Sequence, residues 1–254
     1  MTAIFAVILG FIEGLTEFLP ISSTAHLILA ADIMSIGEEA STKTFEIAIQ
    51  SGAILAVLVM YWRSFFDTEK LKKILFAFIP TGILGLLFYK IVKTYLLGNI
   101  PVVLTALAVG GALLIFFERK IVRHMNTGRI DISYRDAFVI GMCQACAIVP
   151  GVSRSAASII GGLSLGISRE SIVEFSFLLA VPTLLAATGF DVIKNSHAFS
   201  TSDVYMLTIG SLAACITALI SIKYFLKYIR HHSLVPFGIY RILLAGAFFL
   251  LYIR

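Results

Sequence analysis

Long apolar runs separated by short polar segments dominate this sequence. Six of the runs are long enough to cross a bilayer, whose hydrocarbon core of about 30 Å takes about 20 residues in a helix. They lie at residues 45–62, 75–97, 101–117, 172–192, 204–226 and 237–253. The pattern therefore predicts an all-α, polytopic membrane protein with six transmembrane helices.

Two further apolar regions are each interrupted by a break that contains proline and serine. In the first region the long leg is 2–19, the break is 20–23 and the short leg is 24–34. In the second region the long leg is 137–149, the break is 150–155 and the short leg is 156–167. The short legs cannot cross a bilayer, and irregular backbone at membrane depth is tolerated only against protein or a wet cavity. We therefore expect two re-entrant helical hairpins in addition to the six spans.

The two halves of the chain resemble each other. Gly10-Phe11-Ile12-Glu13 aligns with Gly141-Met142-Cys143-Gln144 at an offset of 131 residues, and each stretch leads to a proline and then to serines. Each half, about 1–125 and 126–254 of a single membrane domain, holds one hairpin and three spans. Because three is odd, the second half is expected to be inverted relative to the first. The hairpin tips should then meet near the midplane, where inverted-repeat membrane proteins build their sites.

The positions of lysine and arginine test this arrangement. If the six segments cross and both hairpins return to their own side, one face receives thirteen of these residues and the other five. The thirteen are Arg63, Lys70, Lys72, Lys73, Arg119, Lys120, Arg123, Arg129, Arg135, Arg169, Lys223, Lys227 and Arg230. The five are Lys43, Lys90, Lys93, Lys194 and Arg254. Cytoplasmic loops carry the excess of positive charge, so the first face is predicted to be cytoplasmic and both termini to lie outside.

Composition supports the membrane class and excludes others. Hydrophobic residues make up 59% of the 254 residues and charged residues 14%, against roughly 25% charged in soluble domains. The mean hydropathy is +0.96. These values exclude a soluble domain, a disordered chain and a nucleic-acid-binding domain. Three cysteines, all in apolar runs, argue against a disulfide framework. We expect no cleaved signal peptide, because no basic residues precede the first apolar run.

The first break follows two glutamates, Glu13 and Glu17, that are four residues apart and share one helix face. Buried carboxylates repel each other unless a proton, a cation or an arginine lies between them. A hard divalent cation, Mg²⁺ or Ca²⁺, suits two carboxylates together with phosphate oxygens. The alternative is that this leg lies at the water interface with its acids solvated. Glu46 and Gln50, also four apart, are expected to surround the site as supporting residues.

Ser22, Ser23 and Thr24 open the first short leg with a cluster of hydroxyl groups. Such residues commonly cap a helix, and the same helix N-terminus offers N–H groups to an anion. His26 follows Ser23 by about one turn, within expected reach of a hydroxyl and two carboxylates. This favours acid–base or nucleophilic chemistry. The alternative is a histidine that only forms hydrogen bonds in the protein interior.

The second break places Ser153, Arg154 and Ser155 at the start of the second short leg, with Ser158 one turn later. Backbone N–H groups, hydroxyls and a guanidinium together predict a phosphate-binding site. The alternative is that Arg154 pairs with a glutamate of the first hairpin and holds the two hairpins together in the ligand-free protein.

Two motifs resemble those of a known family. Glu-Gly-Leu-Thr-Glu-Phe-Leu-Pro-Ile-Ser-Ser-Thr-Ala-His at 13–26 and Pro-Gly-Val-Ser-Arg-Ser at 150–155 are similar to the signature motifs of the bacterial undecaprenyl pyrophosphate phosphatases, the bacitracin-resistance BacA type. The resemblance extends to Phe45-Glu46, to the segment that starts at Gln50, and to the layout of the whole chain. Ala156 and Ser158 stand where many members carry glycine and threonine, so a hydroxyl is kept at 158.

The resemblance implies an enzyme that removes the terminal phosphate of undecaprenyl pyrophosphate, which returns the lipid carrier to peptidoglycan synthesis. It also implies a divalent cation and a site open to the outer side of the bacterial cytoplasmic membrane. By position, it assigns Glu13 and Glu17 to the acidic motif, Ser22, Ser23 and His26 to the catalytic hairpin, and Ser153, Arg154 and Ser155 to phosphate binding.

The sequence leaves the nucleophile open. Ser23 with His26 as its base is our first hypothesis, and direct attack by His26 or by a metal-activated water are the others. The expected partners are the lipid substrate and the membrane lipids, and a homodimer is left open. The main rival function is an inverted-repeat transporter or lipid-carrier flippase. A catalytically idle resistance or scaffold protein is the third hypothesis. The serine, histidine and carboxylate set exceeds what transport requires, which favours the enzyme.

Overall fold

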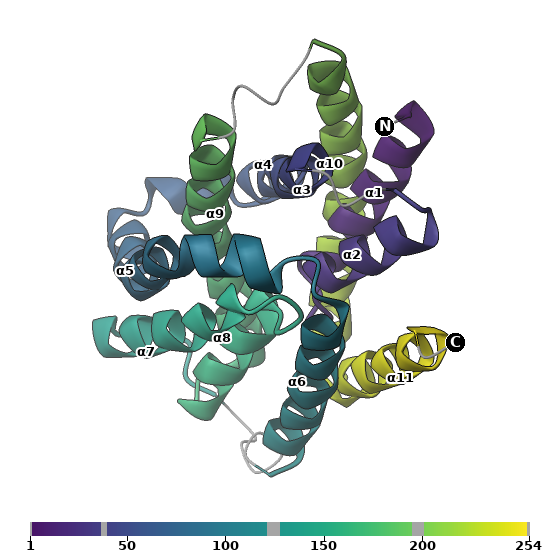
Figure 1. The fold of residues 1–254 in the computed structure, drawn as a ribbon. Coiled ribbons are helices and arrows are strands. Elements are labelled where there is room, and N and C mark those ends of the chain that lie inside the picture. The colour runs from purple at the N-terminus through teal and green to yellow at the C-terminus, as the bar shows by residue number, and fades with distance from the viewer. Residues whose placement is uncertain (1, 37–39, 121–127, 195–200, 253–254) are drawn as a thin grey trace.

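Helices form almost all the regular structure in this protein (Figure 1). The computed structural model describes residues 2–36, 40–120, 128–194 and 201–252. The α-helices are α1 Ala3–Thr16, α2 Ser23–Ile33, α3 Ala40–Ala48, α4 Gln50–Met60, α5 Thr68–Ile91, α6 Ile100–Lys120, α7 Tyr134–Ala145, α8 Arg154–Ser164, α9 Arg169–Lys194, α10 Thr201–Ile229 and α11 Val235–Tyr252. Short 3₁₀ turns lie at Trp62–Phe66 and Cys146–Ile148, and a π-helical turn at Val92–Leu96 extends α5. The all-α expectation is confirmed.

Five helices in the described residues are long and apolar enough to cross a membrane, one fewer than the sequence predicts. They are Thr68–Leu96, Ile100–Lys120, Arg169–Asp191, Val204–Ile229 and Val235–Tyr252. The sixth expected span, 45–62, is divided at Ile49 between α3 and α4. There the Gly52 N–H donates to the Ile49 carbonyl at 3.0 Å. This carbonyl is three residues earlier, whereas a regular α-helix pairs residues four apart. Hydropathy does not register such a break, because the residues around it are apolar.

Parts of the sequence prediction lie outside the described residues. These are Arg123, Arg254, the last residue of the expected span 237–253, and the boundary between the two halves at 125 and 126.

The two expected hairpins have the same backbone geometry. Ser22 and Ser153, 131 residues apart, both have positive φ angles, of 72° and 78°. Each serine then caps the next helix, since its Oγ accepts a hydrogen bond from the backbone N–H three residues later, at 3.4 Å in α2 and 3.2 Å in α8. The short helices also end alike, because Ser35 and Gly166 have φ angles of 52° and 83° at the same offset. The internal similarity of the sequence is therefore also a similarity of the backbone.

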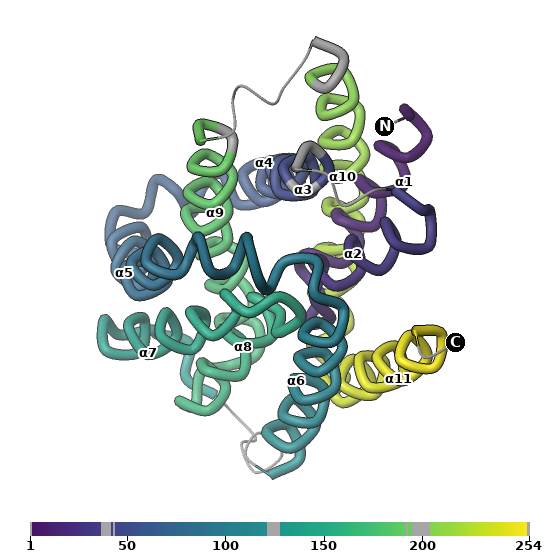
Figure 2. Tube along the Cα trace, in the orientation of Figure 1, coloured from purple at the N-terminus to yellow at the C-terminus, as the bar shows by residue number. Residues whose placement is uncertain are grey.

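The long legs pack against helices of the opposite half. Helix α1 lies along α10, and its counterpart α7 lies along α5. Both contacts depend on glycine, because a Cβ added at Gly10 would overlap the Gly210 carbonyl oxygen and one at Gly141 would overlap that of Ala77. Helix α4 contacts both α9 and α10, as the chain trace in Figure 2 also shows. Each half is thus held by the other rather than standing alone.

Helix α9 supplies much of the interior, whereas the outer helices expose large apolar side chains. Ile172, Val173, Phe177 and Leu178 of α9 are buried in the main core cluster. In contrast, residues such as Leu87 on α5 are largely exposed. Exposed apolar faces of this extent mark contact with lipid or partners, which agrees with the five candidate spans.

Candidate active site

The bends of the two hairpins are in direct contact. The Ser155 hydroxyl donates a hydrogen bond of 2.8 Å to the Leu19 carbonyl. Arg154, the first residue of α8, donates from Nη2 to Oε1 of Glu17 at 3.0 Å, and the two side chains are 10% and 5% exposed. The sequence prediction that the hairpin tips meet is confirmed. The pairing of Arg154 with a glutamate, considered as an alternative to phosphate binding, is present in the structure.

The Glu17 carboxylate also accepts a hydrogen bond from Ser23. The Ser23 hydroxyl opens α2 and donates to Oε2, the carboxylate oxygen that Arg154 does not use. A buried carboxylate that accepts a hydrogen bond from a serine hydroxyl is placed to act as a general base for that serine. The structure therefore brings together Glu17, Ser23 and Arg154.

Glu13 lies one turn before Glu17 and is fully buried. Neither of its carboxylate oxygens has a hydrogen-bond partner among the described residues. An uncompensated buried carboxylate is costly, so this side chain calls for a proton or a cation. With Glu17 beside it, the donor set fits a hard divalent cation whose remaining ligands are phosphate oxygens and water. The described residues contain no cluster of three or more His, Cys, Asp and Glu side chains suited to a metal.

His26 points to α11 rather than to Ser23. Its Nδ1 lies 2.7 Å from the Ser22 carbonyl, and its Nε2 lies 2.8 Å from the hydroxyl of Tyr240. Because a carbonyl can only accept, Nδ1 carries the proton, and in the neutral ring Nε2 accepts from Tyr240. His26 is not among the residues that line the pocket described below. Its predicted role as a base stays a prediction.

Arg154 is held by α9 as well as by Glu17. Its Nη1 donates to the Ser176 carbonyl at 2.8 Å, and the Ser176 hydroxyl lies 2.7 Å from that of Ser158. The guanidinium also lies over the Phe18 ring, 5.6 Å from its centroid. The Nε of Arg154 has no hydrogen-bond partner in the described part of the chain. A fixed guanidinium with a donor to spare is suited to an anion.

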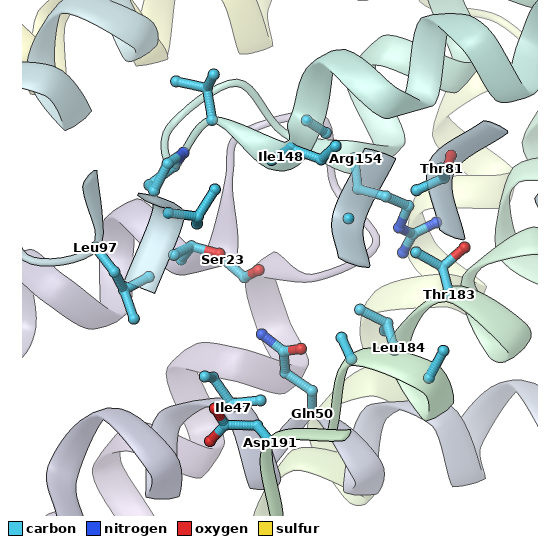
Figure 3. A pocket seen from close by; sticks show the side chains of 18 of the residues that line it. Ser23, Ile47, Gln50, Thr81, Leu97, Ile148, Arg154, Thr183, Leu184 and Asp191 are labelled. Atoms are coloured by element: carbon cyan, nitrogen blue, oxygen red, sulfur yellow. The ribbon is translucent and has the colours of Figure 1, made fainter. Parts of the chain in front are cut away.

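A cavity of about 290 Å³ extends from these bends between α5 and α9 (Figure 3). Figure 3 shows Arg154 at one end of the lining and Asp191 toward the other. Of the predicted site residues, the cavity is lined by Glu17, Ser22, Ser23, Thr24, Glu46, Gln50, Ser153 and Arg154. The others, Glu13, His26, Ser155 and Ser158, are not among its lining residues. Apolar side chains, including Phe78, Leu86, Leu97 and Leu184, complete the walls.

A polar network in the cavity wall was not predicted. The Gln144 amide nitrogen donates to the hydroxyls of Thr81 and Thr183, at 3.1 and 2.9 Å. These residues come from α7, α5 and α9, so the network joins three elements. The repeat offers a signal for Gln144, because it aligns with Glu13.

Arg241 of α11 is a second residue that the sequence prediction left out. It is fully buried and donates to carbonyl oxygens of both bends, Gly151 at 2.8 Å and Pro20 at 3.4 Å. It also donates to Ala106 and Leu107 of α6. A single arginine in an apolar span indicates a functional or structural role, because a charge is costly inside a membrane. Here it ties the two bends to the α6 and α11 pair.

The whole chain is similar to known proteins. A family model described as "Bacitracin resistance protein BacA" matches residues 6–247. The chain is 50% identical to the undecaprenyl-diphosphatase of Sulfurihydrogenibium sp. strain YO3AOP1, over 99% of this chain and 100% of that protein. It is 49% identical to the undecaprenyl-diphosphatase of Aquifex aeolicus, over 98% and 100% of the two chains. The undecaprenyl-diphosphatase of Methanococcus aeolicus is 43% identical over 100% of both.

Proposed function

The chain belongs to the bacitracin resistance protein BacA family and is an undecaprenyl-diphosphatase, and we propose that the cavity at the two bends is its active site. The observation that carries the proposal is the double pairing of Glu17, which accepts from the Ser23 hydroxyl and from Arg154. The substrate is undecaprenyl diphosphate, an amphiphile. The polar end of the cavity suits its diphosphate and the apolar walls suit its isoprenoid chain.

The reaction begins with attack of the Ser23 oxygen on the terminal phosphorus. The Ser23 proton passes to Glu17, the bond from phosphorus to the bridging oxygen breaks, and undecaprenyl phosphate leaves. Arg154 turns from Glu17 to the phosphoryl oxygens, which makes Glu17 a stronger base at the moment it is needed. Glu17 then passes the Ser23 proton to the oxygen of the departing undecaprenyl phosphate. Water attacks the phosphoserine and gives a proton to Glu17, which returns it to the Ser23 oxygen as inorganic phosphate leaves. Catalysis of this kind depends mostly on positioning and on charge stabilisation.

Glu13 and Glu17 are the residues that would hold a divalent cation, Mg²⁺ or Ca²⁺. When bound there, the cation offsets negative charge on the transferring phosphoryl group. Support comes from the buried Glu13 carboxylate, whose oxygens lack partners in the described structure. Binding of Mn²⁺ to the purified protein, followed by electron paramagnetic resonance, tests this without turnover. We expect Glu13→Gln to weaken the binding at least about tenfold; unchanged binding would remove Glu13 from the metal site.

We also propose that the protein is an inverted-repeat, multi-pass protein of the cytoplasmic membrane. The α1–α2 hairpin enters from outside and the α7–α8 hairpin from the cytoplasm, and the cavity opens outward. The paired φ angles at Ser22 and Ser153 and the exchanged packing of α1 and α7 support this arrangement. The thirteen-to-five distribution of lysine and arginine supports the orientation. In this arrangement α3 and α4 together form the sixth crossing, with a break at Ile49. A homodimer stays a prediction.

Phosphate release from undecaprenyl diphosphate in detergent micelles tests the proposed site. Micelles have no two sides, so a transporter or flippase would release none, whereas the enzyme releases phosphate. We expect Glu17→Gln to lower kcat by about a hundredfold or more, because a neutral amide cannot take up the Ser23 proton. Wild-type turnover in Glu17→Gln, in protein shown to be folded by its thermal melt, would overturn the proposed site.

A further inference from the structure

A second polar cluster lies in the cavity wall, away from the Glu17 and Arg154 pair. The Lys93 ammonium contacts Oδ1 of Asp191, and the Tyr89 hydroxyl donates to the same oxygen at 2.6 Å. All three residues line the cavity that contains Ser23 and Arg154. The Lys93 side chain is 20% exposed and that of Asp191 is 1% exposed. The lysine side chain is therefore accessible to solvent, whereas its aspartate partner is not.

The chain around Lys93 has an unusual local structure. Lys93 lies in the π-helical turn Val92–Leu96 that extends α5, and such wide turns are frequent at functional sites. A second cation is near, since the Lys194 ammonium lies 4.4 Å from the centroid of the Tyr89 ring. Lys93, Lys194 and Asp191 together carry a net positive charge, and in the proposed orientation both lysines lie on the outer face.

A purely structural role for the Lys93 and Asp191 pair leaves part of this geometry unexplained. Such a pair would only hold α5 against α9, and the hydrogen bond from Tyr89 to Asp191 already does so. An ammonium has three N–H donors, and Asp191 accepts from one of them. Asp191 keeps the Tyr89 hydrogen bond when Lys93 turns toward another anion. The lysine can therefore exchange Asp191 for a phosphate oxygen without leaving the buried aspartate devoid of a hydrogen-bond donor.

We propose that Lys93 is a phosphate-binding residue at the outer mouth of the cavity, with Asp191 holding its ammonium ready in the ligand-free protein. The ligand chemistry is a phosphate oxygen, from either the lipid diphosphate on its way in or inorganic phosphate on its way out. This inference rests on the proposed function, since it assumes that diphosphate reaches Ser23 through this cavity. Lys93 binds the phosphate group transiently and takes no part in the chemical step.

The test compares Lys93→Ala with Lys90→Ala in the purified protein. Lys90 lies three residues earlier on α5, is exposed, and does not line the cavity, so it is the matched control. If Lys93 receives the lipid headgroup, Lys93→Ala raises KM for undecaprenyl diphosphate about five- to tenfold and leaves kcat within twofold. If it binds released phosphate, the inhibition constant of inorganic phosphate rises by that factor instead. Lys93→Arg should restore either value, and Lys90→Ala should change neither.

A binding measurement separates this inference from the proposed function. Inorganic pyrophosphate should raise the Tm of the wild-type protein and of Lys90→Ala, and should raise that of Lys93→Ala less at the same concentration. This shift does not depend on turnover, so an inactive wild-type protein would overturn the proposed function alone. The inference about Lys93 is overturned if KM, the phosphate inhibition constant and the pyrophosphate shift all match the wild type. A purely structural pair predicts that outcome, with only a lower Tm in Lys93→Ala.

Discussion

Glu17 shows how one residue serves two states of the site. Its two oxygens are taken by Ser23 and Arg154 in the ligand-free structure, so neither hydroxyl nor guanidinium is left without a partner. Removing one partner of a buried ion pair is costly, because the other charge is left buried and unpaired. An arriving phosphate avoids that cost at Arg154, because it takes the place of the carboxylate. In the proposed mechanism the same contact links the hairpins and is exchanged for a phosphate when the substrate binds.

Arg154→Lys separates these two roles of Arg154. Lysine keeps the charge but loses the planar fork that binds two oxygens at once. We expect a loss on the order of 1.5–3 kcal/mol of charge-assisted hydrogen bonding, or roughly ten- to hundredfold in kcat/KM. The measurement is kcat/KM in protein of known Tm. A value within threefold of wild type would mean that Arg154 only fastens the hairpins.

Tyr240→Phe tests the role of His26. The substitution removes the hydroxyl that donates to His26 Nε2 and leaves an aromatic ring in place. If His26 holds the start of α2, we expect a loss of about 0.5–1.5 kcal/mol in stability and an unchanged pH–rate profile. If His26 is the proton acceptor, the acidic limb of the kcat/KM profile will shift, because the partner of its Nε2 has been lost.

At the level of elements, the repeated hairpins depend on close helix contacts at Gly10 and Gly141. A methyl group at either position would overlap a carbonyl oxygen of the facing helix. We expect Gly10→Ala and Gly141→Ala each to lower stability by about 1–3 kcal/mol. Gly246→Ala is the control, because nothing lies within 4 Å of a Cβ there. Equal Tm values for all three variants would refute the role of these contacts.

The sequence predicts what depends on local pattern. Five of the six spans, both hairpins and the meeting of their tips follow from hydropathy, from the prolines and serines, and from the 131-residue offset. The break at Ile49 is missed because it lies between apolar residues. The partner of His26 is missed because Tyr240 is 214 positions away and one of nine tyrosines. The contacts of Arg241 with both bends are missed as well, although a lone arginine in apolar sequence is itself a signal.

At the scale of the whole molecule, the two halves are interlocked around the site. Arg241 donates to both bends and to α6, while α1 and α7 each lie on a helix of the other half. Displacement of one hairpin would therefore disturb the other. This accounts for a site assembled from residues more than 130 positions apart, such as Glu17 and Arg154.

The proposed orientation makes a prediction about the faces of the molecule. In protein whose native cysteines Cys143, Cys146 and Cys215 are replaced by serine, Asn99→Cys should react with an impermeant thiol reagent added outside intact cells. Ser233→Cys should react only after the cells are opened. Both residues are exposed in the structure. Reaction of both cysteines from the same side would refute the inverted arrangement.

The central claim is that Ser23, activated by Glu17, attacks the terminal phosphorus of undecaprenyl diphosphate. The most direct measurement is kcat/KM of Ser23→Ala in detergent, beside Ser51→Ala, a serine that does not line the cavity. The account predicts a loss of about a thousandfold or more for Ser23→Ala, because within the described ranges no other hydroxyl donates a hydrogen bond to Glu17. It predicts near wild-type activity for Ser51→Ala. Activity of folded Ser23→Ala within tenfold of wild type would contradict it.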